Sequence, residues 1–181
     1  MQTEYFKSSG KGNTDRAFAV AKGYVQKHKV KSIIVASTTG YTARKAAEVF
    51  KDRNLIIVTH FTGMIRRDHQ QFPSTLRKRL EAKGVKVLTT AHAFGGINKL
   101  FEQSVGSIIA DTLRMFSEGT KVAVEIALMA ADSGLVKTTE DVVVIAGTGK
   151  GADTVLVIKP ANSTNLFDLR IKEVLAKPIL N

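Results

Sequence analysis

The residues best suited to binding chemistry form a short polar loop between an apolar run and a helix-forming segment. The apolar run is Ile33 to Val35, and the helix formers extend from Ala43 to Phe50. Unpaired amides at a helix start, backed by the positive end of the helix dipole, bind oxyanions. The pattern predicts a phosphate-binding loop, although an ordinary capped turn explains these residues equally well. The loop comprises Ser37, Thr38, Thr39, Gly40, Tyr41 and Thr42.

Two further loops with reactive side chains follow the next two apolar runs, Leu55 to Val58 and Val85 to Leu88. Because parallel strands end at one edge of a sheet, where ligands bind, both loops are expected beside the phosphate loop. A histidine there acts either in proton transfer or as a hydrogen-bonding wall, and the sequence leaves both roles open. Two histidines without an assignable carboxylate do not predict a metal site. The first loop contains His60, Phe61, Thr62, Gly63 and Met64, and the second contains His92.

A glycine-rich loop links the β-branched run Val142 to Ile145 with a second run, Thr154 to Ile158. The link is too short for a helical crossover, which predicts an antiparallel hairpin. Its G-x-G-x-G spacing differs from the dinucleotide-binding fingerprint. The glycines either supply turn conformations or let the backbone approach a ligand. Asp153 either accepts a hydrogen bond from that ligand or caps the loop. The candidate ligand contacts are Gly147, Thr148, Gly149, Lys150 and Asp153.

The order of these motifs resembles the C-terminal domain of pyruvate kinase. The stretch I-I-V-x-S-x-T-G-x-T-A, residues 33 to 43, is similar to the segment with which that domain holds the phosphate of its sugar-phosphate effector. Residues 134 to 159 resemble its last two strands and the intervening loop, which is shorter here. With the helix before each, the two stretches cover most of residues 13 to 159. The chain is identified as a member of the pyruvate kinase C-terminal (alpha/beta) domain-like family.

The resemblance implies residue roles and a cofactor. The family's phosphate-holding positions fall on Ser37, Thr39, Gly40 and Thr42. Free-standing relatives are associated with flavin mononucleotide (FMN), which is therefore the expected cofactor. Its ring would extend past Gly147 to Lys150 and His60 to Gly63, with Tyr41, Phe61 or Met64 as an apolar face. The shorter loop and the lack of tryptophan favour one phosphate on a flat body over a sugar bisphosphate.

Composition limits the remaining function classes. The 181 residues, 44% of them hydrophobic, suit one ligand-binding domain over 1–181 without the (β/α)8 barrel that carries the kinase chemistry. The absence of cysteine excludes disulfides, thiolate zinc sites and cysteine nucleophiles. No apolar run reaches about 18 residues and Met1 to Gly12 is polar, so we expect a cytoplasmic protein with no membrane partner.

The net charge of +11 favours anionic partners. Basic residues are spread through the chain, and the densest group, Arg77 to Arg79, falls on an amphipathic helix where a solvated face is the plainer explanation. Few aromatic residues accompany this group. The expected partner is therefore a phosphorylated small molecule, and nucleic acid is the less favoured alternative.

The elements that must position these loops alternate between strands and helices. We expect a helix from Asn13 to His28 after a flexible lead-in, and one broken helix or two short ones over residues 97 to 117. Phe167 to Ile171 alternates like a short edge strand. The apolar helix Lys121 to Ala131 is expected to be buried against the sheet and either a neighbouring element or a second subunit of a homo-oligomer. The predicted fold class is α/β, three-layer α/β/α, with a mixed, mostly parallel sheet of about five strands and an antiparallel last hairpin.

Three functions remain open. The first is a binding module for a phosphorylated small molecule, with FMN as the best candidate. The second is a small flavin-dependent oxidoreductase or a phosphate-ester-transforming enzyme that uses His60 or His92 as proton donor. The third is a regulatory or interaction subunit. Pyruvate kinase activity is not expected of this domain by itself.

Overall fold

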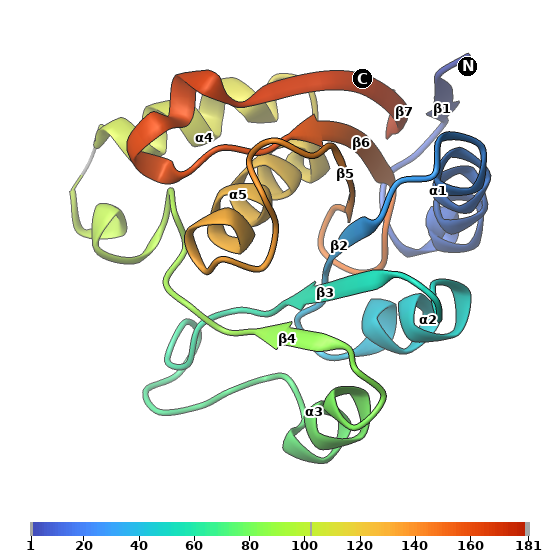
Figure 1. Ribbon diagram of the computed structural model, residues 1–181. Helices are drawn as coiled ribbons and strands as arrows, with labels where there is room; N and C mark the ends of the chain where they lie inside the picture. The colour runs from blue at the N-terminus through green and yellow to red at the C-terminus, as the bar shows by residue number, and fades with distance from the viewer. Residues whose placement is uncertain (1, 102, 180–181) are drawn as a thin grey trace.

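The computed structural model describes residues 2–101 and 103–179 as a three-layer α/β/α arrangement (Figure 1). A seven-stranded sheet forms the middle layer in the order β1-β7-β6-β5-β2-β3-β4. The single domain predicted over 1–181 includes Met1, Glu102, Leu180 and Asn181, which lie outside the described residues. The elements are β1 (Glu4–Phe6), η1 (Lys11–Asn13), α1 (Thr14–His28), β2 (Ser32–Ala36), α2 (Tyr41–Val49), β3 (Asn54–Val58), α3 (Ser74–Glu81), β4 (Lys86–Leu88), η2 (Gly96–Leu100), α4 (Val105–Arg114), α5 (Glu118–Asp132), β5 (Val142–Ala146), β6 (Thr154–Lys159), η3 (Ser163–Asp168) and β7 (Arg170–Pro178).

Short apolar strands form the centre of the sheet and pair in parallel. β2 lies between β3 and β5, with Ile34 opposite Ile56 on one side and Val144 on the other. Strands that are buried on both faces read as continuous apolar runs, which is the pattern of β2, β3 and β5. β6 returns antiparallel to β5, with Val143 opposite Val157. The predicted α/β/α layering, mixed sheet and antiparallel hairpin are therefore confirmed.

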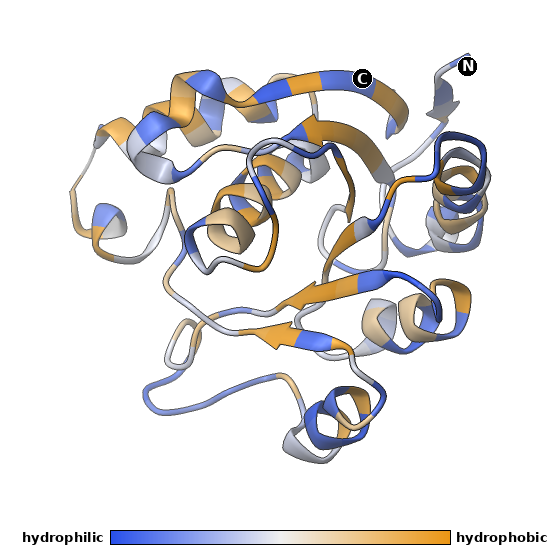
Figure 2. Cartoon of the chain, viewed as in Figure 1, coloured by the Kyte–Doolittle hydropathy of each residue, from blue (hydrophilic) through white to orange (hydrophobic). Residues whose placement is uncertain are grey.

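Different helices cover the two faces of the sheet. α1, α2 and α3 pack on one face, which receives Ile33 and Val35, whereas α4 and α5 pack on the other, which receives Ile34. This division follows from the alternation of side chains along a strand. Figure 2 shows the strands as the largely hydrophobic middle of the molecule. The edge where the strands end is left for loops.

The sheet has seven strands, against about five expected, because β1 and β7 extend it. Tyr5 and Phe6 belong to β1, which pairs in parallel with β7, so the prediction of a flexible lead-in was wrong there. A three-residue strand with one buried side chain leaves no periodic signal. β7 lies between β1 and β6 and is therefore not an edge strand. Phe167 belongs to η3, and the alternation seen from Phe167 becomes a strand only at Arg170.

The helix α5 is buried by its own chain. All of its residues from Gly119 to Ala131 are buried except Val122. The sheet covers one side, and Ala110, Ile109 and Leu113 of α4 pack on it from another. The predicted burial is confirmed, and the neighbouring element replaces the second subunit as its cover. The described residues between 97 and 117 include two helices, η2 and α4, and Ser104 Oγ caps α4 by accepting the Ser107 N–H at 3.1 Å.

An apolar surface lies on the outer side of η2 and α4. More than half of the large apolar side chains that the described residues expose fall within residues 97–116. We call this set the α4 surface: Ile97, Leu100, Phe101, Val105, Ile108, Met115 and Phe116. Within the described ranges, no helix has both the length and the apolar character to cross a lipid bilayer.

Candidate functional site

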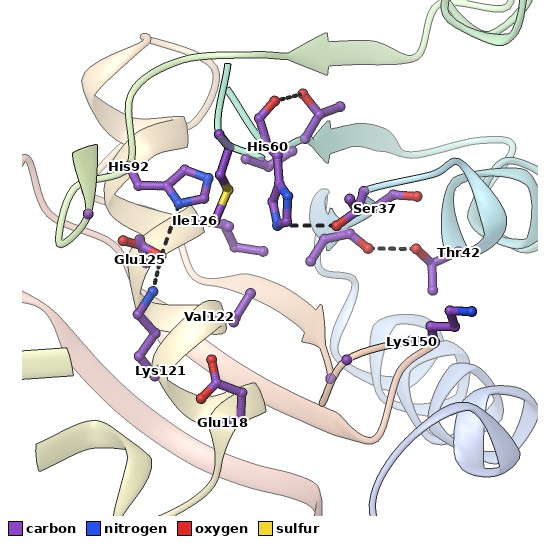
Figure 3. A pocket seen from close by; sticks show the side chains of 18 of the residues that line it. Ser37, Thr42, His60, His92, Glu118, Lys121, Val122, Glu125, Ile126 and Lys150 are labelled. Atoms are coloured by element: carbon purple, nitrogen blue, oxygen red, sulfur yellow. Dashed lines mark hydrogen bonds and ion pairs between the residues drawn. The ribbon is translucent and has the colours of Figure 1, made fainter. Parts of the chain in front are cut away.

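A cavity of about 910 Å³ opens at the carboxyl ends of the parallel strands, between η1, α2, α4 and α5 (Figure 3). It lies at the edge that the sequence predicted, because β2, β3 and β5 all end there. Its volume falls within the range of small-molecule sites, about 300–1,000 Å³. The predicted residues that line it are Ser37, Thr38, Thr39, Tyr41, Thr42, His60, Met64, His92, Gly147, Gly149 and Lys150.

A tight turn between β2 and α2 shapes one end of the cavity. Gly40 has φ of 91°, the left-handed region that favours glycine, and a Cβ there would lie 2.3 Å from Leu76 Cδ2. Thr42 Oγ1 donates to Ala36 O at 2.6 Å, which fastens the first turn of α2 to the end of β2. These contacts leave no room for a longer or bulkier turn. The turn is therefore held against α3 and the end of β2, while its neighbours Thr39 and Tyr41 line the cavity.

The first turn of α2 offers main-chain donors to the cavity. Ser37 Oγ accepts the Ala43 N–H at 3.2 Å, and Gly40 O accepts the Arg44 N–H at 3.1 Å. Across the described ranges, the N–H groups of Tyr41 and Thr42 have no acceptor. Helix-terminal amides of this kind, together with the helix dipole, favour an anion.

Two lysines add charge at the same end. Lys11 and Lys150 line the cavity, and neither forms an ion pair with any residue that the structure describes. Lys11 Nζ lies 4.8 Å from the centre of the Tyr41 ring, a cation–π contact that holds it beside α2. Lys150 lies on the same side of the cavity as Thr42 (Figure 3). We call Ser37 to Thr42, Lys11 and the Gly147 to Gly151 loop the anion end.

A buried carboxylate holds the glycine-rich loop. Asp153 is 0% exposed, and its Oδ2 accepts the N–H groups of Gly10 at 2.7 Å and Thr148 at 3.1 Å. Asp153 Oδ1 accepts the Thr154 hydroxyl at 2.8 Å. Because both oxygens are used and Asp153 does not line the cavity, the geometry favours the loop-capping role over a ligand contact. The carboxylate joins the loop to the residue before η1.

The glycines of this loop are required for close packing. A Cβ on Gly147 would lie 2.8 Å from Gly151 O. Gly151 has φ of 78°, and a Cβ there would lie 2.6 Å from Lys11 Cα. The loop therefore sits directly on η1, and this packing brings the segments that carry Lys11 and Lys150 to one end of the cavity.

The two predicted histidines meet in the cavity wall. His60 lies between Thr38 and Gln71, with Nε2 3.3 Å from Thr38 Oγ1 and Nδ1 3.1 Å from Gln71 Oε1. Its ring centre is 5.5 Å from that of His92, and the Phe61 ring meets His92 edge-on at 5.2 Å. A row of polar side chains thus runs from the anion end across the ends of β2, β3 and β4.

A charged cluster lies beyond His92, and we call it the distal end. Glu125 Oε1 accepts the Phe94 N–H at 2.9 Å, while its Oε2 accepts from Lys121 Nζ and lies 3.9 Å from His92 Nδ1. Glu125 is 2% exposed and Lys121 8%. A second group on α4 and α5 joins Arg114 to Asp111 and Glu118, each at 2.6 Å. The hydrogen bond with Glu118 raises the pKa of the Arg114 guanidinium further above its ordinary value.

The structure separates the predicted site residues into two groups. Most line the cavity, but six do not: Gly40, Phe61, Thr62, Gly63, Thr148 and Asp153. Four of these six residues shape or contact the loops around the cavity: Gly40, Phe61, Thr148 and Asp153. Within the described ranges, no three His, Asp or Glu side chains cluster closely enough to hold a metal ion.

Sequence reasoning missed several lining residues. Lys121 and Glu125 are the two charged residues of an apolar helix, and that contrast was the available signal. Lys11 and Gln71 come from segments without a motif, and only the fold brings them to the cavity. The other polar lining residues that were missed are Thr59, Ser107, Asp111, Arg114 and Glu118.

The fold and the cavity define an α/β domain with a ligand-sized site where its parallel strands end. The chain belongs to the pyruvate kinase, alpha/beta domain family, whose sequence model matches residues 16–158, and this confirms the predicted family. It is also similar to two crystal structures of pyruvate kinase from Cryptosporidium parvum, at 14% identity and TM-scores of 0.40 and 0.37. Each comparison covers 78% of this chain and 22% of the pyruvate kinase. This chain thus corresponds to a small part of the length of those enzymes.

Proposed function

We propose that this chain binds a phosphorylated small molecule, with the phosphate at the anion end. The observation that carries the proposal is the convergence there of the Tyr41 and Thr42 amides with Lys11 and Lys150. Charge-assisted hydrogen bonds to a phosphate contribute about 1.5–3 kcal/mol each. Ser37 and Thr42 fasten the turn, which leaves the hydroxyls of Thr38 and Thr39 in the cavity lining as further contacts.

The distribution of charge favours one phosphate on a neutral body. The two cations of the anion end have no acidic partner among the described residues, whereas each cation of the distal end is paired with a carboxylate. A second phosphate at the distal end would meet Asp111, Glu118 and Glu125, and like charges repel. A monoester with an uncharged body fits both ends.

FMN is our proposed ligand, since it combines one phosphate with a flat uncharged ring and the family resemblance points to it. The test is the absorption spectrum of freshly purified protein, followed by mass spectrometry of any small molecule released on denaturation. We expect a flavin spectrum or, in colourless protein, quenching of FMN fluorescence on titration. Colourless protein that also ignores added FMN would overturn the flavin assignment, and binding of ribose 5-phosphate would then preserve the phosphate site.

A phosphate-ester-transforming or flavin-dependent enzyme is the second candidate, favoured by the placement of His60 and His92 in the cavity wall. In that case replacement of either histidine by Gln abolishes turnover of a bound phosphate ester and leaves its affinity nearly unchanged. A collapse of affinity instead assigns the residue to the binding wall. Pyruvate kinase activity is not proposed for this chain alone.

We also propose that the α4 surface joins two copies of this chain. Val105, Ile108, Thr112 and Met115 follow the spacing of a two-helix seam. Arg114, the one basic residue of α4, is paired with Asp111 and Glu118, so α4 presents no unpaired cation to a second copy of this basic chain. Sedimentation velocity should give a dimer that Ile108→Lys converts to a monomer, and a wild-type monomer would contradict this.

A further inference from the structure

The buried ion pair of α5 has no explanation in the stability of that helix. Lys121 and Glu125 are one turn apart, both line the cavity, and they are 8% and 2% exposed. Burying two charges carries a desolvation penalty of several kcal/mol per ion, and apolar residues of similar volume are often neutral or better for stability. Apart from Thr120, the other buried residues of the helix are glycine or apolar. A buried charged pair that faces a ligand-sized cavity therefore points to recognition.

The hydrogen bonds orient the lysine and leave it donors. Both oxygens of Glu125 are engaged, one by the Phe94 N–H at 2.9 Å and the other by Lys121 Nζ. An ammonium has three N–H donors, and Glu125 is the only acceptor that Lys121 has in the part of the chain described here. Figure 3 shows Lys121 extended along α5 toward Glu125, with Val122 and Ile126 beside it in the cavity wall.

The surroundings define what the remaining donors can accept. Each cation of the distal end already has a carboxylate partner, since Lys121 is paired with Glu125 and Arg114 with Asp111 and Glu118, so the two cations and three carboxylates leave no positive charge for a second anion to neutralise. The remaining wall there is apolar and is formed by residues such as Phe94, Val122 and Ile126. An uncharged ring fits this wall, and a carbonyl oxygen on its edge satisfies an ammonium donor without adding charge.

We propose that Lys121 is the specificity-determining residue of the site and that it donates a hydrogen bond to a carbonyl oxygen on the uncharged ring of the ligand. Glu125 is the positioning residue, because it holds both Lys121 and the loop that carries His92 and Phe94. The inference rests on the proposed function, since the phosphate of the same ligand occupies the anion end. The ligand class is a phosphate monoester of a carbonyl-bearing ring.

Four probes and one double variant test this assignment. FMN carries ring and phosphate, riboflavin the ring alone, and ribose 5-phosphate and inorganic phosphate lack the ring. Lys121→Met with Glu125→Gln removes both charges and keeps an acceptor for the Phe94 N–H. We expect the double variant to lower FMN affinity about 10- to 100-fold, the loss of one hydrogen bond from a charged donor, and to leave ribose 5-phosphate affinity within about twofold. Lys22→Met, on the exposed side of α1, is the matched control for charge and should change neither.

Each outcome is decisive. Unchanged FMN affinity, or equal losses for FMN and ribose 5-phosphate, overturns the assignment of Lys121. Wild-type protein that binds ribose 5-phosphate but neither flavin also overturns it, while the proposed phosphate site stands. Riboflavin binding that depends on Lys121, without binding of ribose 5-phosphate or phosphate, supports the assignment and overturns the proposed function. Should the double variant fail to fold, Lys121→Arg retains the charge and must still lower FMN affinity selectively.

Discussion

The two ends of the cavity are built in different ways. The anion end consists of main-chain amides and small hydroxyls at a strand–helix junction, fixed by Gly40 and by the buried Asp153. The distal end consists of ionised side chains from α4 and α5, with a loop after β4 tied to them through Glu125. The turn of the anion end is local in sequence, although Lys11 and the Gly147 to Gly151 loop join it from distant segments. The distal end joins the loop after β4 to α5 across 31 positions, from Phe94 to Glu125.

This contrast indicates how the binding energy and the specificity for a ligand divide between the two ends. Backbone donors at a rigid turn bind any phosphate and do not distinguish between esters. Side chains that are oriented by buried partners can distinguish one body from another. Changes at the anion end should therefore affect all phosphate ligands alike, whereas changes at the distal end should depend on the ligand.

Loss of the Asp153 carboxylate gives the largest expected effect on the anion end. Asp153→Ala removes the acceptor of the Gly10 and Thr148 amides, so the free energy of unfolding should fall by about 3 kcal/mol and phosphate binding should be lost. Urea denaturation and calorimetric titration with inorganic phosphate measure the two quantities. Asp153→Asn keeps one acceptor and should lose less. Undiminished phosphate affinity in the Ala variant would contradict the dependence of this end on one carboxylate.

A side chain at Gly40 should have the next largest effect. Gly40→Ala forces a Cβ toward Leu76 at a positive φ, so we expect a loss of about 1–2 kcal/mol in stability and about tenfold in affinity for inorganic phosphate. Gly84→Ala is a matched control, because that glycine also has a positive φ but its Cβ would meet nothing within 4 Å. It should lose stability only. Equal phosphate affinity in both variants would show that the turn does not contribute to phosphate binding.

Removal of one lysine should weaken binding without unfolding the protein. Among the described residues, Lys150 and Lys11 form no ion pair, so stability should change by less than about 0.5 kcal/mol in Lys150→Met. Lys11→Met also loses the cation–π contact with Tyr41 and should cost up to about 1 kcal/mol. Affinity for ribose 5-phosphate should fall about 5- to 20-fold, and the difference from wild type should shrink in high salt. Fluorescence or calorimetric titration at two salt concentrations measures this. A variant that is insensitive to salt would place the lysine outside the site.

High pH should destabilise the fold without acting through either end. Burial, followed by the hydrogen bond to Glu173, raises the pKa of Tyr24 to about 12. Because the folded pKa lies above the unfolded value of about 10, the stabilisation is complete below pH 10 and is lost as pH rises from about 10 to 12. The expected loss by pH 11 is on the order of 1 kcal/mol. Urea denaturation of wild type and Tyr24→Phe from pH 9 to 11 checks this, and parallel curves would contradict it.

The same contrast explains what the sequence could predict. The turn from Ser37 to Thr42 and the glycine-rich hairpin are local patterns, and both lie at the cavity as expected. The positions of Lys11 and Gln71 depend on how distant segments pack, so no motif marks them. The strand β1 was not predicted for a related reason, since only its pairing with β7 makes Glu4 to Phe6 a strand. The prediction of FMN came from the family resemblance, because neither the sequence motifs nor the packing of the chain identifies a flavin.

The tie between Gly10 and Asp153 spans 143 positions of the chain, and the bond from Ala152 N–H to Thr14 Oγ1 spans 138. Closing such long loops lowers the entropy of the chain before enough stabilising contacts have formed to compensate, so contacts of this range tend to form late in folding. We expect the anion end to form only after the central strands have assembled. Added phosphate should accordingly slow unfolding while leaving the rate of refolding nearly untouched.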